Sequence, residues 1–215
     1  MAKPKQKIKI EWSENFAYAI GLIVTDGCLS KSGRHVEFTS KDLDQVENFL
    51  FALNIKSRIT LKTRAKEKEK KYFRVQIGDV CFYRFLESIG LMQKKTLIMG
   101  QITIPREFFA DFLRGHFDGD GYFYSYMDPR WKSSHMFYLV FTSASQDHLK
   151  WLNQMILDYY EIQGTISFSR RCGLLKYSKK KAEKLILIFY KDPKSLCLTR
   201  KRLKVSAGLS ILQAR

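Results

Sequence analysis

Several features are missing from this 215-residue sequence. No apolar run is long enough to span a bilayer, and the basic first residues lead into no hydrophobic stretch typical of a secretory signal. Its four cysteines form no CxxC pair, and its four histidines are equally dispersed. A disulfide framework and a zinc site are therefore not expected. These absences predict an intracellular protein with reduced thiols, in a compartment that the sequence does not specify.

Acidic residues are scarce relative to basic ones. The sequence has 21 Asp and Glu against 38 Lys and Arg, a formal net charge of +17, while 45% of its residues are hydrophobic. Such a chain can bury a core, and its positive surplus favours a polyanionic partner. Nucleic acid is the first expectation, and a membrane surface is the alternative.

Two short segments of the chain resemble each other. Residues 19–27 read AIGLIVTDG, and residues 113–121 read LRGHFDGDG. Each has a Gly four residues before a small residue, which an Asp and a closing Gly follow. A repeated element with one acid per copy can bring Asp26 and Asp120 together at an internal two-fold axis.

The order of elements after each segment also repeats. Hydrophobic periodicity predicts an α+β chain of two αββαββα units. We expect the first repeat over residues 1–98, a linker over 99–105 and the second repeat over 106–215. In the first repeat, the predicted elements include a helix at 42–53, strands at 57–64 and 71–78, and a helix at 80–89. In the second, they are strands at 121–127 and 136–143, a helix at 146–159, strands at 165–171 and 184–190, and a helical region from 193.

Each repeated segment is predicted to end a helix. Ser13 is a suitable N-cap for the first helix, and Pro105 suits the first turn of the second. Gly27 and Gly121 are expected as left-handed C-caps, with both acids in the last turn. A carboxylate there opposes the helix dipole, and a bound divalent cation would reverse that penalty. The glycines farther back would let the two helices approach closely. Two ordinary helix ends followed by tight turns are the alternative.

These residues resemble the LAGLIDADG homing endonuclease family, in its monomeric two-motif form. Gly21 and Gly115 match the first Gly of the family motif, Asp26 and Asp120 match its last Asp, and the closing glycines also match. The resemblance implies two antiparallel saddle-shaped sheets with the motif helices packed at their joint. It implies that Asp26 and Asp120 bind Mg²⁺, or another divalent cation such as Mn²⁺, with help from the backbone carbonyls of Thr25 and Gly119. The implied reaction is hydrolysis of one phosphodiester in each strand of double-stranded DNA.

The family also places basic residues near the scissile phosphates. Residues 92–97 (MQKKTL) and 198–203 (LTRKRL) align Lys95 with Lys201, which are our candidates for this role. Lys94 and Arg200 are close seconds, and plain surface charge is the alternative. In the second motif, we expect His116 to be a packed interface histidine and Asp118 to pair with a nearby basic residue.

Strand alternation predicts one polar face on each sheet. Such a β-ribbon fits the DNA major groove, where Arg and Gln can read base edges. A solvated sheet face is the alternative for any single residue. The candidate DNA-binding residues are Lys62, Arg64, Arg74 and Gln76 in the first half, and Tyr124, Ser169 and Arg171 in the second. Two saddles that each cover about one helical turn predict a site of roughly 20 bp.

The sequence thus favours a monomeric, metal-dependent, site-specific DNA endonuclease of the homing, often intron-encoded, type. One alternative is a non-cleaving binder on the same fold, such as an intron RNA maturase or a DNA-binding regulator. Another is a basic α/β domain with an unrelated partner, which predicts that Asp26 and Asp120 do not converge.

Overall fold

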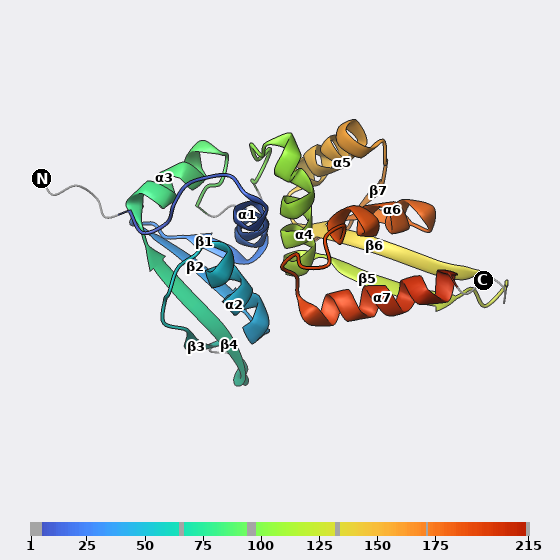
Figure 1. Ribbon diagram of the computed structural model, residues 1–215, viewed down its shortest axis with the longest axis horizontal. Coiled ribbons are helices and arrows are strands. Elements are labelled where there is room, and N and C mark those ends of the chain that lie inside the picture. The colour runs from blue at the N-terminus through green and yellow to red at the C-terminus, as the bar shows by residue number, and fades with distance from the viewer. Residues whose placement is uncertain (1–5, 65–66, 94–97, 132–133, 171, 214–215) are drawn as a thin grey trace, which may run out of the picture.

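The computed structural model describes residues 6–64, 67–93, 98–131, 134–170 and 172–213 (Figure 1). Two four-stranded antiparallel sheets lie on either side of a central pair of helices. The first half contains α1 (Glu14–Asp26), β1 (Gly27–Leu29), β2 (His35–Ser40), α2 (Leu43–Ala52), β3 (Thr60–Arg64), β4 (Glu67–Gly78) and α3 (Val80–Ser88). The second contains the short 3₁₀ helix η1 (Arg106–Phe108), α4 (Phe109–Asp120), β5 (Tyr122–Met127), β6 (His135–Ser143), α5 (Gln146–Tyr160), β7 (Thr165–Phe168), β8 (Gly173–Ser178), α6 (Lys180–Phe189) and α7 (Thr199–Gln213).

The two sheets have the same topology. Their strand orders are β1-β2-β4-β3 and β5-β6-β8-β7, and every neighbouring pair is antiparallel. The predicted α+β class and the twofold αββαββα order are confirmed. The short helix η1 and the added helix α7 have no counterpart among the described elements of the first half. This repetition places α1 and α4 in equivalent positions, each leading directly into the first strand of its sheet.

The predicted strand at 184–190 is wrong, because these residues belong mostly to helix α6. Ala182, Leu185, Ile186 and Phe189 are buried, which is the i, i+3, i+4, i+7 pattern of an amphipathic helix. The strand expected in this part of the repeat is instead β8, immediately before the helix. It pairs with β6 and β7 in the sheet.

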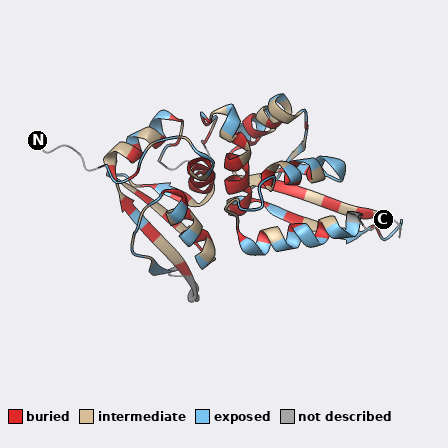
Figure 2. Ribbon diagram, in the orientation of Figure 1, coloured by how far each residue is buried: buried red, intermediate tan, exposed pale blue. Residues whose placement is uncertain are grey.

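The two central helices are the most deeply buried part of the chain (Figure 2). Residues 16–24 of α1 and residues 109, 112, 113 and 117 of α4 are almost completely inaccessible. Around them, the sheets alternate: in β2, Val36 and Phe38 face the core while Glu37 and Thr39 are partly exposed. The first sheet therefore has one apolar face under its helices and one polar face.

The segment between the halves is bonded to both of them. On the first half, the Thr103 amide donates to the Ile89 carbonyl at 2.8 Å. On the second half, the Ser145 hydroxyl donates to the Met99 carbonyl. We call residues 99–104 the strap, because their backbone ties α3 to the start of α5.

Candidate active site

Helices α1 and α4 touch through their glycines. A Cβ atom added to Gly21 would lie 2.7 Å from the backbone nitrogen of His116, and one added to Gly115 would lie 3.2 Å from the Gly21 Cα. Both distances are too short for an ordinary carbon contact, so these positions accept no side chain. The predicted close approach of the two motif helices at their glycines is confirmed. This contact fixes the position of one helix end relative to the other.

Both motif acids terminate their helices, as predicted, but the glycines after them are not left-handed. Gly27 has φ −81° and ψ 151°, and Gly121 has φ −78° and ψ 161°, so both are extended. The predicted left-handed C-caps are therefore wrong. Glycine is needed here for space, because a Cβ at Gly27 or Gly121 would strike the preceding helical turn, 2.7 Å from the Cα of Ile23 or Phe117 respectively. The chain passes straight from helix to strand, which leaves each acid at the sheet edge.

Asp26 and Asp120 line two different cavities, and Thr25 borders both of them. Asp26 is half-buried and lines a cavity of about 450 Å³ together with Thr25, Gly119 and Arg200. Asp120 is exposed and lines a smaller pocket of about 60 Å³ that also includes Thr25. A Cβ at Gly119 would lie 2.9 Å from Asp26 Oδ2, so the first carboxylate rests against the end of the second motif helix. The two acids therefore belong to one helix joint.

The Thr25 side chain is held at this joint by its own helix. Its hydroxyl lies 2.9 Å from the Leu22 carbonyl and 3.3 Å from Asp26 Oδ2. A hydroxyl that donates to a carbonyl in the preceding turn ties the side chain to its own helix. This arrangement restrains Thr25 next to the carboxylate that we predicted as a metal ligand.

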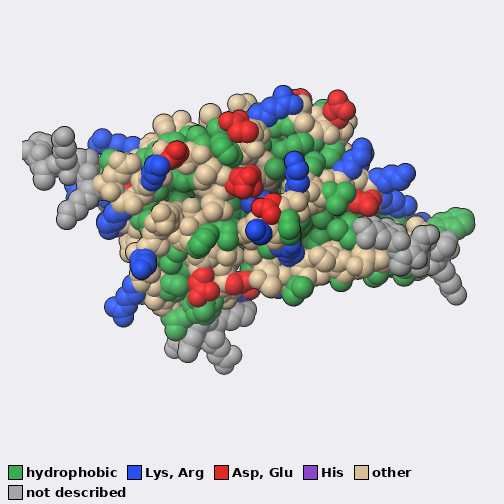
Figure 3. All heavy atoms as spheres, viewed as in Figure 1, with side chains coloured by type: hydrophobic (Ala, Val, Ile, Leu, Met, Phe, Trp, Pro, Cys, Tyr) green, Lys and Arg blue, Asp and Glu red, His purple; other side chains and the backbone are tan. Residues whose placement is uncertain are grey.

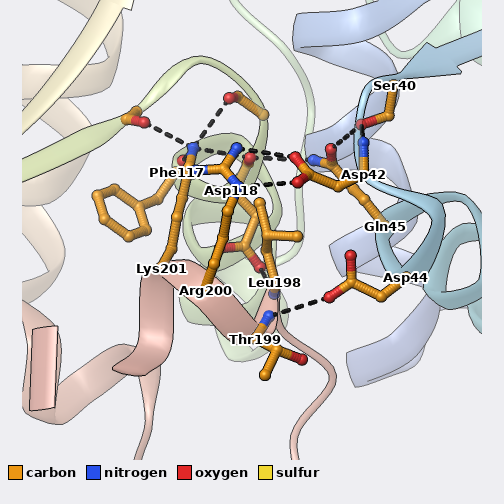
Figure 4. A network of polar contacts seen from close by, with 12 residues as sticks. Ser40, Asp42, Asp44, Gln45, Phe117, Asp118, Leu198, Thr199, Arg200 and Lys201 are labelled. Carbon is orange, nitrogen blue, oxygen red and sulfur yellow. Dashed lines mark hydrogen bonds and ion pairs between the residues drawn. The ribbon is translucent and has the colours of Figure 1, made fainter. Parts of the chain in front are cut away.

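Lys201 lies at the equivalent end of the second motif helix, but its ammonium is buried. Its Nζ donates to the carbonyls of Phe117, Asp118, Gly119 and Gly121 at 2.6, 2.7, 3.0 and 2.6 Å (Figure 4). The residue is only 8% exposed. A cation is favourable at the negative end of a helix, where carbonyls lack intrahelical partners. Lys201 thus neutralises the end of α4, and one of its acceptors is the Gly119 carbonyl that we predicted as a metal ligand.

Asp118 completes this buried network. Its Oδ2 accepts hydrogen bonds from the Tyr18 hydroxyl of α1 at 2.9 Å and from the Leu198 amide at 2.7 Å. Burial raises the pKa of the Asp118 carboxyl to about 6. Burial likewise lowers the pKa of Lys201 to about 8, although the carboxylates of Asp118, Asp26 and Asp120 oppose this shift. The predicted pairing of Asp118 with a basic residue is wrong as a direct contact, because its described hydrogen-bond donors are neutral.

A second network joins the two halves across the larger cavity. The Arg200 guanidinium forms a bidentate pair with Asp42, at 2.9 and 2.8 Å (Figure 4). The Gln45 amide donates to the Asp118 carbonyl at 3.0 Å, and the Thr199 amide donates to Asp44 at 3.3 Å. Helix α2 is thus fastened to the start of α7. The sequence offered no signal for this network, because its partners are between 73 and 158 residues apart.

His116 packs inside the joint, as predicted. Its Nε2 lies 3.0 Å from that of His148, and the two rings are stacked with an interplanar angle of 10°. His148 Nδ1 lies 3.0 Å from the Gly100 carbonyl, so this nitrogen carries a proton. The motif helix is therefore connected through two histidines to the strap.

Three of the predicted DNA-contacting residues of the first sheet share one face: Lys62, Arg74 and Gln76. Lys62 Nζ lies 2.6 Å from Glu37 Oε1, and Arg74 Nε lies 3.0 Å from Glu37 Oε2. The Arg74 guanidinium also donates to Gln76 at 3.0 Å. This first-sheet face is therefore a network of charges around one carboxylate.

The predicted residues of the second sheet do not form a comparable group. Tyr124 lies in β5 beside other tyrosines, whereas the exposed Ser169 follows β7 in a turn, where its hydroxyl contacts the Cys172 carbonyl at 2.9 Å. The predicted strand at 165–171 ends at Phe168, which takes Ser169 out of the expected polar row. Lys94, Lys95 and Arg171 lie outside the described residues. Arg64 is the last residue of β3, and only its backbone is described.

Charge on the molecular surface is mixed. Acidic and basic side chains lie side by side on the face shown in Figure 3. The surplus of +17 is therefore not spread as a uniform coat over this face.

The donor set at the joint suits a hard divalent cation. The available ligands are two carboxylates and nearby backbone carbonyls, all oxygen atoms, which Mg²⁺ and Mn²⁺ accept. Across the described residues, no group of three His, Cys, Asp or Glu side chains could hold a metal. A cation here would therefore draw its remaining ligands from water or from substrate phosphate.

The comparisons with known proteins agree with this geometry. Residues 13–90 match the LAGLIDADG-like domain. The first half therefore contains a LAGLIDADG-like domain, and the whole chain has the LAGLIDADG fold. Comparison with curated proteins gives no match. In the part of the chain that the structure describes, no helix has both the length and the apolar character to cross a membrane.

Among solved structures, similar chains include the homing endonuclease I-WcaI bound to its DNA recognition sequence, with a TM-score of 0.61 and 14% identity over 90% of this chain and 86% of that one. I-DmoI in complex with DNA and Ca has a TM-score of 0.53 and 18% identity, covering 83% and 90%, and the same enzyme is also known with DNA and Mn. Full-length WhiA from Thermatoga maritima has a TM-score of 0.56 and 17% identity; the match covers 96% of this chain but 66% of WhiA. At these identities, the likeness establishes the fold, which homing endonucleases and WhiA share.

Proposed function

We propose that this chain is a site-specific endonuclease that cuts both strands of double-stranded DNA. In this proposal, it acts as a monomer of two repeats, over residues 1–98 and 106–215, joined by residues 99–105. Its target spans roughly 20 bp, about two turns of the double helix. Mg²⁺, or another divalent cation such as Mn²⁺, is the cofactor.

One observation carries this proposal: acids from both repeats flank Thr25 at the same glycine-packed joint. Binding DNA does not require acids there, since they oppose the helix dipoles and repel phosphate. The rival of a basic domain with an unrelated partner predicted acids that lie apart. The convergence therefore favours hydrolysis.

We assign a different role to each of the residues at the joint. Asp26 and Asp120 would hold the divalent cation, with the Thr25 carbonyl beside them. A divalent cation held there would supply Lewis-acid chemistry, by activating water and stabilising negative charge on the leaving oxygen. Arg200 lines the same cavity as Asp26 and is 61% exposed in its side chain, so we assign it the contact with a backbone phosphate. Lys201 is a positioning residue, because its ammonium is engaged by the end of α4.

A non-cleaving DNA or RNA binder is the second candidate. The buried Lys201 ammonium favours it, because this charge already neutralises the carbonyls at the end of the second motif helix. A helix end satisfied in this way needs no added cation for stability.

Cleavage of a duplex library separates the two candidates. The protein is incubated with randomised DNA in Mg²⁺, and bound DNA is selected separately in Ca²⁺. We expect double-strand breaks at a recurring sequence in Mg²⁺. Selective binding without cutting in Mg²⁺, Mn²⁺ or Ca²⁺ would establish the binder instead.

Variants of the two acids test their roles. Asp26→Asn and Asp120→Asn should each abolish double-strand cleavage while DNA binding persists. Asp147→Asn is the matched control, since this carboxylate lies on α5 with its side chain 84% exposed. Full cleavage by the Asp120→Asn variant would remove this acid from the mechanism.

A further inference from the structure

Four tyrosines form a continuous stack on the second sheet. Tyr122, Tyr124 and Tyr126 project from β5, and Tyr138 lies opposite Tyr124 on β6. Ring centroids are 5.9 Å apart for Tyr122 and Tyr124, 6.3 Å for Tyr124 and Tyr126, and 4.8 Å for Tyr124 and Tyr138. Interplanar angles of 25°, 2° and 20° make these pairs nearly parallel. We call these four residues the tyrosine ladder.

The ladder lies on the sheet face that corresponds to the charged face of the first sheet. Tyr122 follows Gly121 in the same way that Cys28 follows Gly27, so the two residues occupy equivalent positions. Each pairs with a residue of the neighbouring strand, Cys28 with Glu37 and Tyr122 with Val140. Tyr122 and Tyr126 are 39% and 46% exposed, so the stack reaches solvent. It is therefore a surface feature and does not belong to the core.

Two charged residues of the first sheet, Arg74 and Glu37, correspond to the apolar Leu174 and Val140 of the second. Thr39 pairs with Arg74 in the first sheet, whereas Thr142 pairs with Leu174 in the second. One row farther along, Glu37 pairs with Gln76, whereas Val140 pairs with Lys176. The Lys176 ammonium lies 5.2 Å from the centre of the Tyr138 ring. The face of the second sheet thus combines phenols with one lysine, where the first carries a charge network.

The stacking decides which part of each tyrosine can meet a ligand. Neighbouring rings lie close together and nearly parallel, so we expect a ligand to meet their edges and hydroxyls first. The side chains of Tyr126 and Tyr138 also form a hydrogen bond with each other. Burial and the neighbouring tyrosines raise the pKa values of Tyr124 and Tyr138, which keeps both hydroxyls protonated as hydrogen-bond donors.

We propose that the tyrosine ladder reads one half of the DNA site through uncharged contacts, with hydroxyls on base-edge acceptors and ring edges on thymine methyl groups. This inference rests on the proposed function, since it assumes that both sheets face duplex DNA. The other half is contacted by the charge network of Lys62, Glu37 and Arg74, in which the Lys62 ammonium meets a backbone phosphate. Major-groove base edges offer both acceptors and the thymine methyl. The two half-sites therefore contribute unequally to the salt dependence of binding.

Two variants measured on the selected duplex in Ca²⁺ test this division. In the triple variant Tyr124→Phe, Tyr126→Phe and Tyr138→Phe, the rings and their stack remain while three hydroxyls are removed. We expect its affinity to fall at least tenfold, with the slope of log K against log salt unchanged. Lys62→Met should reduce that slope by about one unit, as expected for the loss of one phosphate contact. Circular dichroism checks that the triple variant is folded.

Replacement of thymine by deoxyuracil, one position at a time, locates the methyl contacts. We expect losses of binding confined to one half of the site. Unchanged affinity of the triple variant, a reduced salt slope in it, or deoxyuracil effects in both halves would overturn the inference. Tighter binding of the wild type to single-stranded DNA than to duplex, lost in the triple variant, would also overturn it.

These outcomes are separable from the proposed function. If the wild type cuts DNA and the triple variant binds normally, only the ladder inference fails. If the wild type binds without cutting but shows the predicted pattern, only the endonuclease function fails.

Discussion

The ends of the two motif helices have the same backbone conformation, but different side chains are buried at them. Both helices stop at an Asp, both continue through an extended glycine into a strand, and both lack side chains where they touch. At the sixth motif position, however, α1 has the buried Val24 and α4 has the buried Asp118. The second end therefore contains a carboxylate and the Lys201 ammonium in its interior. The same backbone geometry is thus supported by apolar packing in α1 and by a buried polar network in α4.

Removal of the Lys201 ammonium should lower the free energy of unfolding more than any other change at these two helix ends. Lys201→Met leaves four carbonyls without their donor and removes one of the two positive charges, Lys201 and Arg114, that stabilise the Asp118 carboxylate. Loss of one partner from a buried ionic network costs about 3–5 kcal/mol. Urea denaturation should show this loss in the free energy of unfolding. Lys204→Met on the exposed side of α7 is the matched control, and an equal loss in both variants would contradict the role of Lys201.

The pH dependence of stability should reveal the same network. The pKa of Lys201 is lowered from 10.5 to about 8, so between these values the unfolded state binds more protons than the folded state. Stability should therefore rise as the pH increases from about 8 to 10.5, by at most about 3.5 kcal/mol, at about 1.4 kcal/mol per pKa unit.

The raised pKa of Asp118 acts at lower pH. Its value of about 6 exceeds the ordinary 3.8, so the folded state binds more protons between these values, and stability should fall as the pH rises through them. Denaturation curves across both ranges measure the two effects. Lys201→Met should lack the alkaline rise, and a wild-type profile that is flat above pH 8 would contradict this prediction.

Loss of the hydroxyl that joins the two helices should have a smaller effect. Tyr18→Phe removes the hydrogen bond to Asp118, and a bond to a charged group contributes about 1.5–3 kcal/mol. The same substitution in an Asp118→Asn background should cost less, because the acceptor is then neutral. A double-mutant cycle in urea measures this difference. Equal costs in the two backgrounds would show that Tyr18 acts through packing alone.

The inter-half ion pair should contribute least to stability. Asp42→Asn weakens the pair with Arg200, whose side chain is 61% exposed. Exposed pairs contribute about 0–1 kcal/mol, so we expect a change within this range. Increasing salt should erase it. A loss above 2 kcal/mol would show instead that α2 and α7 depend on this contact for docking.

Local patterns in the sequence predicted most of the fold. Helical and strand periodicity indicated the repeated order, and Ser13 does cap α1, accepting from the Phe16 amide at 3.1 Å. The error at 184–190 came from the apolar run LILI, which suits a strand or a buried helix equally well. The buried spacing from Ala182 to Phe189 would have resolved the ambiguity. The repeat therefore needed only short-range information.

The site could be predicted only in part. Glycine spacing indicated that the two motif helices meet, because residues four apart share a helix face. The same reasoning could not predict that the Lys201 ammonium turns inward, since its acceptors are backbone carbonyls with no sequence signature. Neither could it predict the ladder's partner on β6, since Tyr138 meets Tyr124 through strand register. The limits of the prediction lie where one element meets another.

The strap has a consequence for building chimaeras from related chains. Its backbone bonds to Ile89 on one side and to Ser145 and His148 on the other, so it is shared structure and not a free tether. A recombinant that takes its halves from two parents must therefore inherit matching anchor residues on both sides of the crossover. Lengthening the segment with glycine and serine would not substitute for them.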